Sequence, residues 1–317
     1  MADITNTTGS AGLSPSMQMY YDKKLIKDMK PKLVHCNYGQ KRPIPRNAGK
    51  TVKFRKYTPF EAATTPLTEG VTPDGHAITQ TEISATVAQY GDYVRVTDLL
   101  DMTAVDPVIS DSVELNADQA ALTLDTVVRE VMCAGTNVMY ANGTSRADVA
   151  AGNILTTTLI RKAVRTLKKA KARPFYRNGK PYFYAIVGPD TVYDLQSDEN
   201  WLKVSQYQQA EKIENGEIGK LFGVVFIETT ESKIFATAGA GTPKADVACT
   251  LMFGADAYGL IDIAGSGAAK TIVKTFQSGG TEDPLEQRST IAWKVPAFCA
   301  KILQQTWMLR IEHGISA

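Results

Sequence analysis

The side chains that most often carry out enzyme chemistry are few in this sequence and far apart. The three histidines are His35, His76 and His313, and none stands in an HExxH pattern or in a cysteine–histidine zinc motif. A hydrolytic or structural zinc site therefore lacks its usual ligands. No GxSxG elbow is present, so nothing nominates a serine nucleophile. The sequence thus predicts no catalytic residue, no metal site and no bound cofactor.

Two short fragments are reminiscent of phosphate-binding loops but lack the residues that such loops need. In AGSGAAKT (264–271), alanines stand where both defining glycines should be, and the strand-like Ile272-Val273 follows. In NAGKT (47–51), Ile44 occupies the position of the earlier glycine, and a strand-like stretch again follows. A phosphate loop needs a helix N-terminus behind it to hold the anion. Both fragments are therefore interpreted as ordinary loops.

One group of positive charges has a coherent geometry. A helix is predicted from about Thr157 to Lys171, with apolar residues on one side and basic residues on the other. The basic side consists of Arg161, Lys162, Arg165, Lys168 and Lys169. It could be a DNA-facing surface that contacts phosphates, or a face that is solvated or paired with carboxylates. We favour the second interpretation, and base readout is not indicated because no aromatic residue interleaves these charges.

The overall composition is that of a globular protein rather than a polycation. The 317 residues are 44% hydrophobic and 21% charged, and 35 basic against 33 acidic residues give a net charge of +2. No apolar run reaches the ~18 residues of a membrane span. The first twenty positions are rich in Thr, Asn, Ser and Gly, with no basic residue before Lys23. This pattern excludes a signal peptide and predicts a mobile N-terminal arm.

The cysteines give a further indication of the compartment. They lie far apart and form no CxxC pair: Cys36, Cys133, Cys249 and Cys299. Such cysteines are interpreted as reduced, partly buried side chains of a cytosolic protein, and two disulfides are the alternative.

The elements that must position all these residues are a mixture of helices and strands, which predicts an α+β fold. The most regular is a helix of about 25 residues between Pro107 and Gly135, named here the spine helix, because apolar residues recur every three or four positions. A short helix is predicted over 15–30. Strands are predicted over TVKFRKY, YFYAIV, GKLFGVVFIET, CTLMFGADAYGLIDI and AKTIVKTFQ. Two long strands end the sequence, with a break between them at Pro296.

Residues 64–97 form the most unusual stretch. They alternate like a β-hairpin around Pro73-Asp74-Gly75, but before this turn Leu67 and Val71 are almost the only large apolar residues. Two arms of about 17 residues would each reach roughly 55 Å, against a radius of gyration near ~20 Å for a compact chain of this length. An isolated ribbon is marginal in water. We therefore expect this hairpin to be buried against another subunit.

These features resemble a known protein family. The resemblance is carried by YYDKKLIKDMKPKLVHCNYGQKRPIP (20–45), GKTVKFRKYTPFEAATTPLTEGVTPDG (49–75), VAQYGDYVRVTDLLDMTAVDP (87–107), DQAALTLDTVVREVMCAGTN (118–137) and DPLEQRSTIAWKVPAFCAKILQQTWMLRIEHG (283–314). They are similar to the major capsid proteins of tailed phages with the Hong Kong 97-type (HK97-like) fold, and within these to the phage N4-type family. The similarity is most specific before residue 140.

The resemblance implies four structural parts and a role in a shell. Residues 1–45 would be the N-terminal arm, 46–97 the extended loop, 98–175 and 268–317 the peripheral domain, and 176–267 the axial domain at the capsomer centre. Such proteins assemble in the host bacterial cytoplasm as hexamers and pentamers, form an icosahedral shell around double-stranded DNA, and have no catalytic site. The implied partners are further copies of the chain, a portal protein, scaffolding or decoration proteins, and DNA held without sequence preference. No membrane is implied.

The resemblance also implies two contact regions. The extended loop would touch a neighbouring subunit through Thr65, Leu67, Val71, Asp74, Ile78 and Ile83. The turn QSGGTEDP (277–284) would lie where capsomers meet, with ion pairs formed by Glu282, Asp283, Glu286 and Arg288. Some relatives lock their shells by isopeptide bonds from a lysine of the extended loop. Here Lys56 is the last lysine before Lys162, so a noncovalent shell is predicted.

Two other functions are also compatible with the sequence. A nanocompartment (encapsulin-like) shell protein would use the same fold to enclose a cargo enzyme instead of DNA. A nucleic-acid-binding protein would use the face from Arg161 to Lys169 and would bind duplexes with a steep salt dependence. An enzyme is the function that these residues support least.

Overall fold

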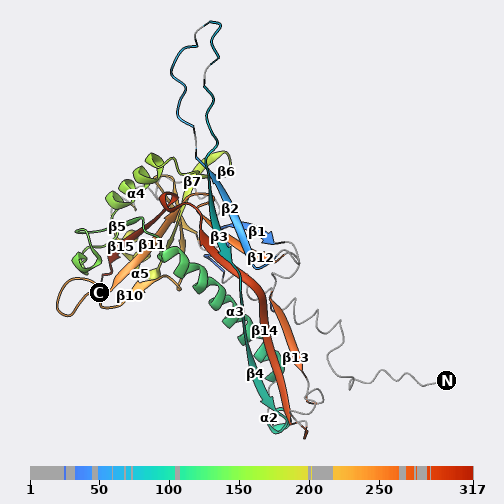
Figure 1. The fold of residues 1–317 in the computed structure, drawn as a ribbon. Coiled ribbons are helices and arrows are strands. Elements are labelled where there is room, and N and C mark those ends of the chain that lie inside the picture. The colour runs from blue at the N-terminus through green and yellow to red at the C-terminus, as the bar shows by residue number, and fades with distance from the viewer. Residues whose placement is uncertain are drawn as a thin grey trace.

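The computed structural model describes residues 25, 33–44, 49–58, 60–67, 69–72, 74–103, 108–198, 201, 217–263, 269–274, 276, 284–285 and 287–316. The predicted helix over 15–30 lies outside this part except for Leu25, which is helical and fully buried. Most of the predicted N-terminal arm also lies outside it. The described helices and strands form two larger sheets and a separate ribbon, so the predicted α+β class is confirmed (Figure 1).

The predicted spine helix is present as α3 (Val108–Cys133), which has 26 residues. Residues that recur at helical spacing, among them Val113, Ala117, Leu124 and Val128, are buried along one side. The first turns of α3 pack on the five-stranded sheet, and its last turns reach the eight-stranded sheet. The spine helix thus joins the two sheets, and its apolar repeat explains why it can do so.

The five-stranded sheet is built around one long strand, β14 (Arg288–Ile302). It pairs with β4 (Ala88–Thr97), β13 (Lys270–Lys274) and β12 (Tyr258–Ile263), and β1 (Gln40–Ile44) joins β12 in parallel. Alternate residues face α3: Val96, Val273 and Ile291 surround Val113. On the same face, the Trp293 indole N–H donates to Gln119 Oε1 at 2.9 Å. At one end of this sheet, the short helix α2 (Asp98–Thr103) follows β4.

The predicted break at Pro296 is wrong, because β14 runs through this residue. The pairing with β4 shifts register between Val295 and Phe298, which marks a bulge. Proline has no N–H to give to a ladder, and a bulge leaves one residue unpaired, so the two features fit each other. The interruption comes later, at Leu303–Trp307, before β15 (Met308–Gly314).

The eight-stranded sheet is buried on both faces. Its main path is β5 (Val138–Tyr140), β15, β11 (Val247–Phe253), β7 (Lys180–Val187), β9 (Val224–Glu228) and β8 (Glu217–Leu221), with β6 (Phe175–Arg177) and β10 (Ile234–Phe235) at its side. Leu251 and Phe253 face α3, whereas Met252 faces the helices α4 (Thr157–Lys169) and α5 (Pro189–Gln196). A strand that is covered on both faces has a nearly continuous apolar sequence. In agreement with this, every residue of β11 is buried.

The segments predicted as the peripheral and axial domains do not correspond to the two sheets, because each segment contributes helices or strands to both sheets. Helix α4, from segment 98–175, packs on the eight-stranded sheet through Ile160, Ala163 and Leu167. Strand β15, from segment 268–317, pairs with β11 and β5 in the same sheet. Strand β12, from segment 176–267, instead joins the five-stranded sheet. Each sheet therefore draws on both segments, and the domain names stay a prediction.

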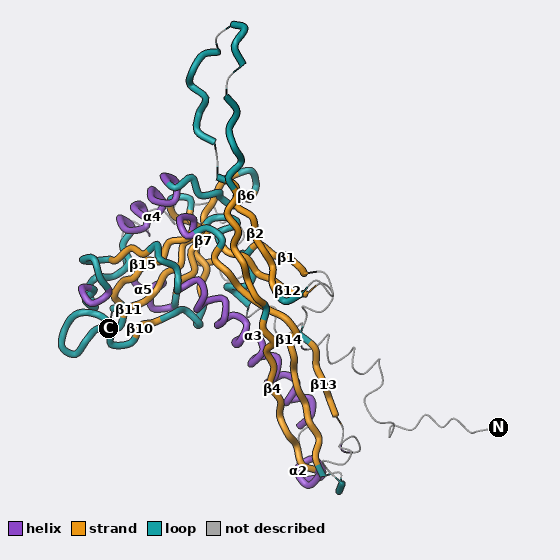
Figure 2. Tube along the Cα trace, in the orientation of Figure 1, coloured by secondary structure: helices purple, strands orange, loops and turns teal. Residues whose placement is uncertain are grey.

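The hairpin differs from the two equal arms expected over 64–97. Its ladder joins β2 (Thr51–Tyr57) to β3 (Gln80–Thr86), and the chain between them extends as a loop well beyond the body (Figure 2). Residues 88–97 are not part of the hairpin at all, because they form β4 and pair with β14. The long β14 offers these residues a partner within the same subunit, which local sequence could not reveal.

Candidate assembly surfaces

The extended loop, defined here as residues 58–79, exposes most of its side chains to solvent. Leu67 is 78% exposed, Ile78 72% and Val71 62%, and Thr65 and Asp74 are exposed as well. Full burial of such an aliphatic side chain is worth about 1.5–3 kcal/mol. A soluble subunit gains none of this energy by itself. The loop therefore provides a large apolar contribution that becomes available only when another surface covers it.

The base of the loop is held firmly by its own subunit. Phe54 and Ala85 are buried against Ile261 of the five-stranded sheet, and Ile83 packs at the edge of this cluster. Ile83, the sixth residue of the predicted contact set, is therefore packed within its own chain. Lys53 Nζ lies 2.7 Å from Glu82 Oε2 across the ladder, and the pKa of Glu82 is lowered by this contact. The packed and paired base thus fixes the direction in which the loop leaves the body.

The basic face of α4 is exposed along its whole length. Leu159, Ile160, Ala163, Val164 and Leu167 are buried on the other side, as the helical pattern predicts. Arg161 lies over the Phe222 ring at 5.6 Å. Within the described part of the chain, none of the five predicted basic residues forms an ion pair with a carboxylate. The face is therefore open to solvent or to an anionic partner.

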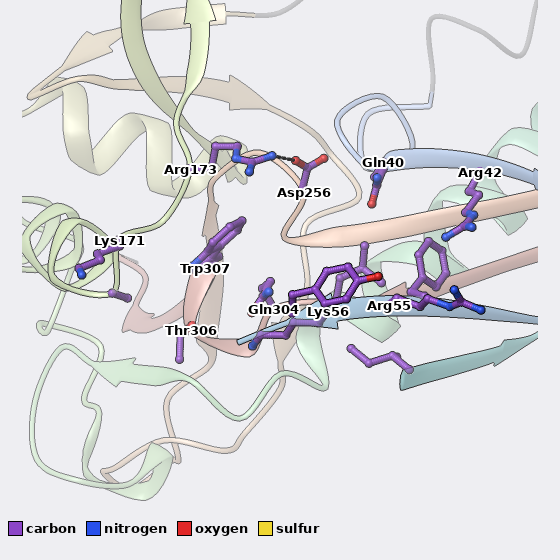
Figure 3. Close-up of a pocket in the computed structure, with 15 residues that line it drawn as sticks. Gln40, Arg42, Arg55, Lys56, Lys171, Arg173, Asp256, Gln304, Thr306 and Trp307 are labelled. Atoms are coloured by element: carbon purple, nitrogen blue, oxygen red, sulfur yellow. Dashed lines mark hydrogen bonds and ion pairs between the residues drawn. The ribbon is translucent and has the colours of Figure 1, made fainter. Parts of the chain in front are cut away.

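A cavity of about 620 Å³ lies where the ribbon base, the end of α4 and the segment 303–307 meet (Figure 3). The charged groups around it are mostly positive: Arg42, Arg55, Lys56, Lys171, Arg173 and a single acid, Asp256. Arg173 Nη1 lies 3.0 Å from Asp256 Oδ2, and Arg42 stacks over the Phe54 ring. Such a cavity can attract anions. No sequence pattern signals it, because its walls come from several distant parts of the chain, between Gln40 and Trp307.

The end of the body that is far from the loop carries a second apolar surface. Leu99 and Met102 of α2 are exposed, Met102 by 79%, and Leu285, shortly before β14 in the sequence, is 76% exposed. The Asp98 N–H donates to the Gln287 carbonyl at 3.1 Å, which ties α2 to the start of β14. Arg288 is exposed there, whereas Glu282, Asp283 and Glu286 lie outside the described residues. Arg288, the described member of the predicted ion-pairing set, therefore lies at the same end of the body as the exposed apolar side chains of α2.

The buried polar side chains of His35 and Asp125 pair with each other inside the body. His35 Nδ1 lies 2.6 Å from Asp125 Oδ2 on α3, the His35 N–H donates to Asp125 Oδ1, and the Tyr258 hydroxyl donates to the His35 carbonyl. His35 and Asp125 are each 1% exposed, so no substrate can reach them. These contacts attach the segment 33–38 to the spine helix.

The cysteines and possible metal ligands show no reactive arrangement. All four cysteines are free thiols, and the Sγ atoms of Cys133 and Cys249 are 3.7 Å apart inside the core. Burial raises the pKa of the Cys36 thiol, which opposes formation of a nucleophilic thiolate. Among the described residues, no cluster of His, Cys, Asp and Glu could hold a metal ion, and no helix is long and apolar enough to cross a membrane.

Comparison with known proteins identifies this arrangement. A family model described as phage capsid protein matches residues 80–311, from β3 to β15. The capsid of Ralstonia phage GP4 superposes with a TM-score of 0.72 at 14% sequence identity, covering 88% of this chain and 87% of that chain. The cyanophage Pam1 capsid gives 0.72 at 14% identity, with both chains covered completely.

More distant capsid structures share the same fold. The head structure of Helicobacter pylori bacteriophage KHP40 gives a TM-score of 0.59 at 11% identity and covers 87% of each chain. No curated protein sequence matches significantly. The overall fold thus recurs in capsid structures that have little sequence in common with this chain. The chain therefore belongs to the phage capsid protein family, has the Hong Kong 97-type fold, and is a major capsid protein of the virion shell.

Proposed function

We propose that this capsid protein assembles as hexamers and pentamers into an icosahedral shell that encloses double-stranded DNA. The observation that carries the proposal is the extended loop, whose apolar side chains have no cover within their own subunit. The shell forms in the host bacterial cytoplasm, and a portal protein and scaffolding or decoration proteins complete it. The protein acts structurally, without catalysis. Membership of the N4-type family within the larger family is part of the same proposal.

In this proposal, Thr65, Leu67, Val71, Asp74 and Ile78 contact a neighbouring subunit. Their exposure and the firm base of the ribbon support an intermolecular role. Residues 1–45 act as the arm, the five-stranded sheet and the spine helix as the peripheral domain, and the eight-stranded sheet with α4 and α5 as the axial domain. This division follows the sheets rather than the predicted segments.

Electron microscopy of the purified protein tests the assembly directly. Closed shells support the proposal, and DNA-filled particles with tails, recovered from infected cells, separate a phage shell from a nanocompartment that holds an enzyme. A protein that stays monomeric at all concentrations, with no shells under any condition, would contradict it.

The basic face of α4 carries a separate proposal, namely that it contacts packaged DNA without sequence preference. The support is that its five cations have no carboxylate partners among the described residues. A phosphate contact should weaken as salt rises, because counterions are released on binding. Replacing Arg161, Arg165 and Lys168 by glutamine should reduce retention of duplex DNA by purified subunits in low salt. Unchanged retention would indicate a solvated face.

A further inference from the structure

Two hairpins of the eight-stranded sheet use the same tight turn with different residues at its first position. Asn178-Gly179 joins β6 to β7 with φ angles of 51° and 75°, and Phe222-Gly223 joins β8 to β9 with φ angles of 51° and 79°. A two-residue turn in which both φ angles are positive favours asparagine followed by glycine. A bulky residue such as phenylalanine is strained in this left-handed region. The β8–β9 turn therefore carries an aromatic side chain at a cost in stability.

The core of the subunit does not use this phenylalanine. Phe222 is 44% exposed and belongs to none of the buried clusters of the described residues. Its ring lies beside α4, where the Arg161 guanidinium is 5.6 Å from the ring centroid. A strained surface residue whose side chain stays outside the core indicates a contact with a partner.

A second exposed aromatic side chain lies close to Phe222. Both belong to a hollow of about 310 Å³ that is lined by Lys168, Ala172, Pro174, Tyr176, Pro181, Phe183, Phe222 and Gly223. Tyr176 is 72% exposed, so its ring is open to solvent as well. Among the described residues, no acidic side chain lines this hollow, and its charged residue is Lys168. Two exposed rings and a cation thus share one concave site.

The hollow continues the basic face of α4. Arg161, Arg165 and Lys168 follow one another at steps of four and three residues, so they form one row on the helix surface. Phe222 lies beside the first of them and shares the hollow with the last. The sequence places no aromatic residue among these charges, and the fold brings in two from other elements. We call the surface formed by Arg161, Arg165, Lys168, Tyr176 and Phe222 the aromatic basic surface.

We propose that the aromatic basic surface binds single-stranded nucleic acid. Sites for single strands combine cations that follow the backbone phosphates with aromatic rings on which the bases stack. Duplex DNA can use only the cations, because its bases are paired and stacked on one another. The inference rests on the proposed phosphate contact of α4. It adds that the two rings make this surface distinguish unpaired from paired strands.

The cavity of Figure 3 fits a single strand less well. Its Arg173 is already paired with Asp256, and its Arg42 is stacked over Phe54. The Asp256 carboxylate would also repel a phosphate. In the aromatic basic surface, by contrast, the three cations form no ion pair with any described carboxylate. The charges and the rings of α4 and its neighbours are therefore both available to one ligand.

Oligonucleotides that differ only in their bases test the role of the rings without any variant. Fluorescence anisotropy in low salt measures binding of the full-length subunit to a short thymidine strand, to an abasic strand with the same number of phosphates, and to a duplex of the same length. The thymidine strand should bind about tenfold more tightly than the abasic strand, as expected for one stacked base. Equal affinities for these two strands would overturn the proposal.

Replacing the strained phenylalanine separates a binding role from a structural one. Phe222→Asn introduces the residue that the β6–β7 turn already has, so the subunit should be at least as stable to heat as the wild type. Its affinity for the thymidine strand should nevertheless fall about tenfold, with no change for the duplex. Tyr176→Ser should act in the same direction. A Phe222→Asn subunit that unfolds at a lower temperature and binds the thymidine strand unchanged would overturn the proposal.

A matched control and a charge variant complete the test. Tyr93→Thr removes another exposed ring beside an arginine, but in β4, and should leave both affinities unchanged. An equal loss of affinity in this control and in Phe222→Asn would contradict a specific site. Replacing Arg161, Arg165 and Lys168 by glutamine should weaken binding of the thymidine strand and the duplex alike.

Two further outcomes separate this inference from the proposal on which it rests. If the glutamine variant loses the duplex while the aromatic variants change nothing, the phosphate contact of α4 stands and only the role of the rings fails. If the wild type binds neither the strand nor the duplex, the phosphate contact has failed as well. An oligoglutamate peptide that binds as tightly as the thymidine strand would assign the surface to an acidic protein and would overturn the proposal.

Discussion

The spine helix and the extended loop lie close together in sequence but use apolar side chains in opposite ways. In α3, Val113, Leu124 and Val128 are buried against sheets of the same chain. In the loop, Leu67, Val71 and Ile78 remain exposed. Burial of apolar surface is the main force that stabilises a fold. The apolar side of the helix is thus covered within one subunit, whereas the apolar side chains of the loop are left exposed, and in the proposed shell a second molecule covers them.

Removal of the extended loop alone is expected to have the largest effect on assembly. Deleting Thr64 to Gly75 shortens the exposed segment and leaves the β2–β3 ladder and its packed base intact. The subunit should therefore keep its thermal unfolding temperature but form no closed shells. Calorimetry and electron microscopy measure the two properties separately. A deleted protein that assembles normally would show that the loop is not an intermolecular contact.

A change in the body should have the opposite effect. Replacing Asp125 by alanine leaves the buried His35 N–H and imidazole without their acceptor. The free energy of unfolding should fall by about 3 kcal/mol, because buried polar groups lose their partner. Asp111→Ala, at an exposed position on the same helix, is the matched control and should change stability by less than about 0.5 kcal/mol. Equal effects in denaturant titrations would contradict the assignment of His35 and Asp125 to the core.

The stability of the body should also depend on pH through His313. This residue is buried, and desolvation lowers its pKa below 6.5. Its Nδ1–H donates to the Gly314 carbonyl, and its Nε2 accepts from Thr250, an arrangement that needs the neutral ring. The unfolded chain therefore binds the extra proton, so stability is complete above about pH 6.5 and is lost as the pH falls below it, by up to about 1.4 kcal/mol per pH unit.

Replacing His313 by glutamine should remove this part of the pH dependence. Urea titrations of both proteins between pH 7 and pH 5 compare the slopes. Identical slopes would mean that other groups cause the loss of stability.

The far end of the body should respond more weakly. Arg288 is exposed at the start of β14, close to α2 and Leu285. Exposed ion pairs contribute about 0–1 kcal/mol each, so Arg288→Glu should lower shell stability slightly and mainly in low salt. Leu99→Ser on α2 is a useful companion, because it tests the apolar part of the same surface. Unchanged dissociation curves for the arginine variant would remove this residue from the contacts between capsomers.

Covalent reinforcement should be absent. Lys56 lies in β2 at the cavity, and the exposed loop beyond it has no lysine that could attack an amide of a neighbour. Arginine cannot replace it, because guanidinium stays protonated. Mature particles boiled in detergent with reductant should give one band at the 34.4 kDa chain mass. A ladder of multiples would reveal crosslinked subunits.

Much of the fold could be predicted because its elements have strong local patterns. The repeat from Val113 to Val131 predicts α3, and Gly188-Pro189 correctly separates β7 from α5. The course of β14 through Pro296 could not be predicted, because it depends on β4, whose residues that pair around Pro296 lie more than 200 positions earlier in the sequence: Val295 pairs with Tyr90 and Phe298 with Ala88. The cavity of Figure 3 could not be predicted for the same reason. Its residues are brought together only by strand pairing, which local sequence does not encode.

The position of the loop in the assembled shell tests the central claim most directly. A cryo-electron microscopy map of shells formed by the unmodified protein would show which atoms surround residues 58–79. We predict that Leu67, Val71 and Ile78 are covered by another copy of the chain. A loop that is exposed to solvent in the shell, or folded back onto its own subunit, would contradict this account.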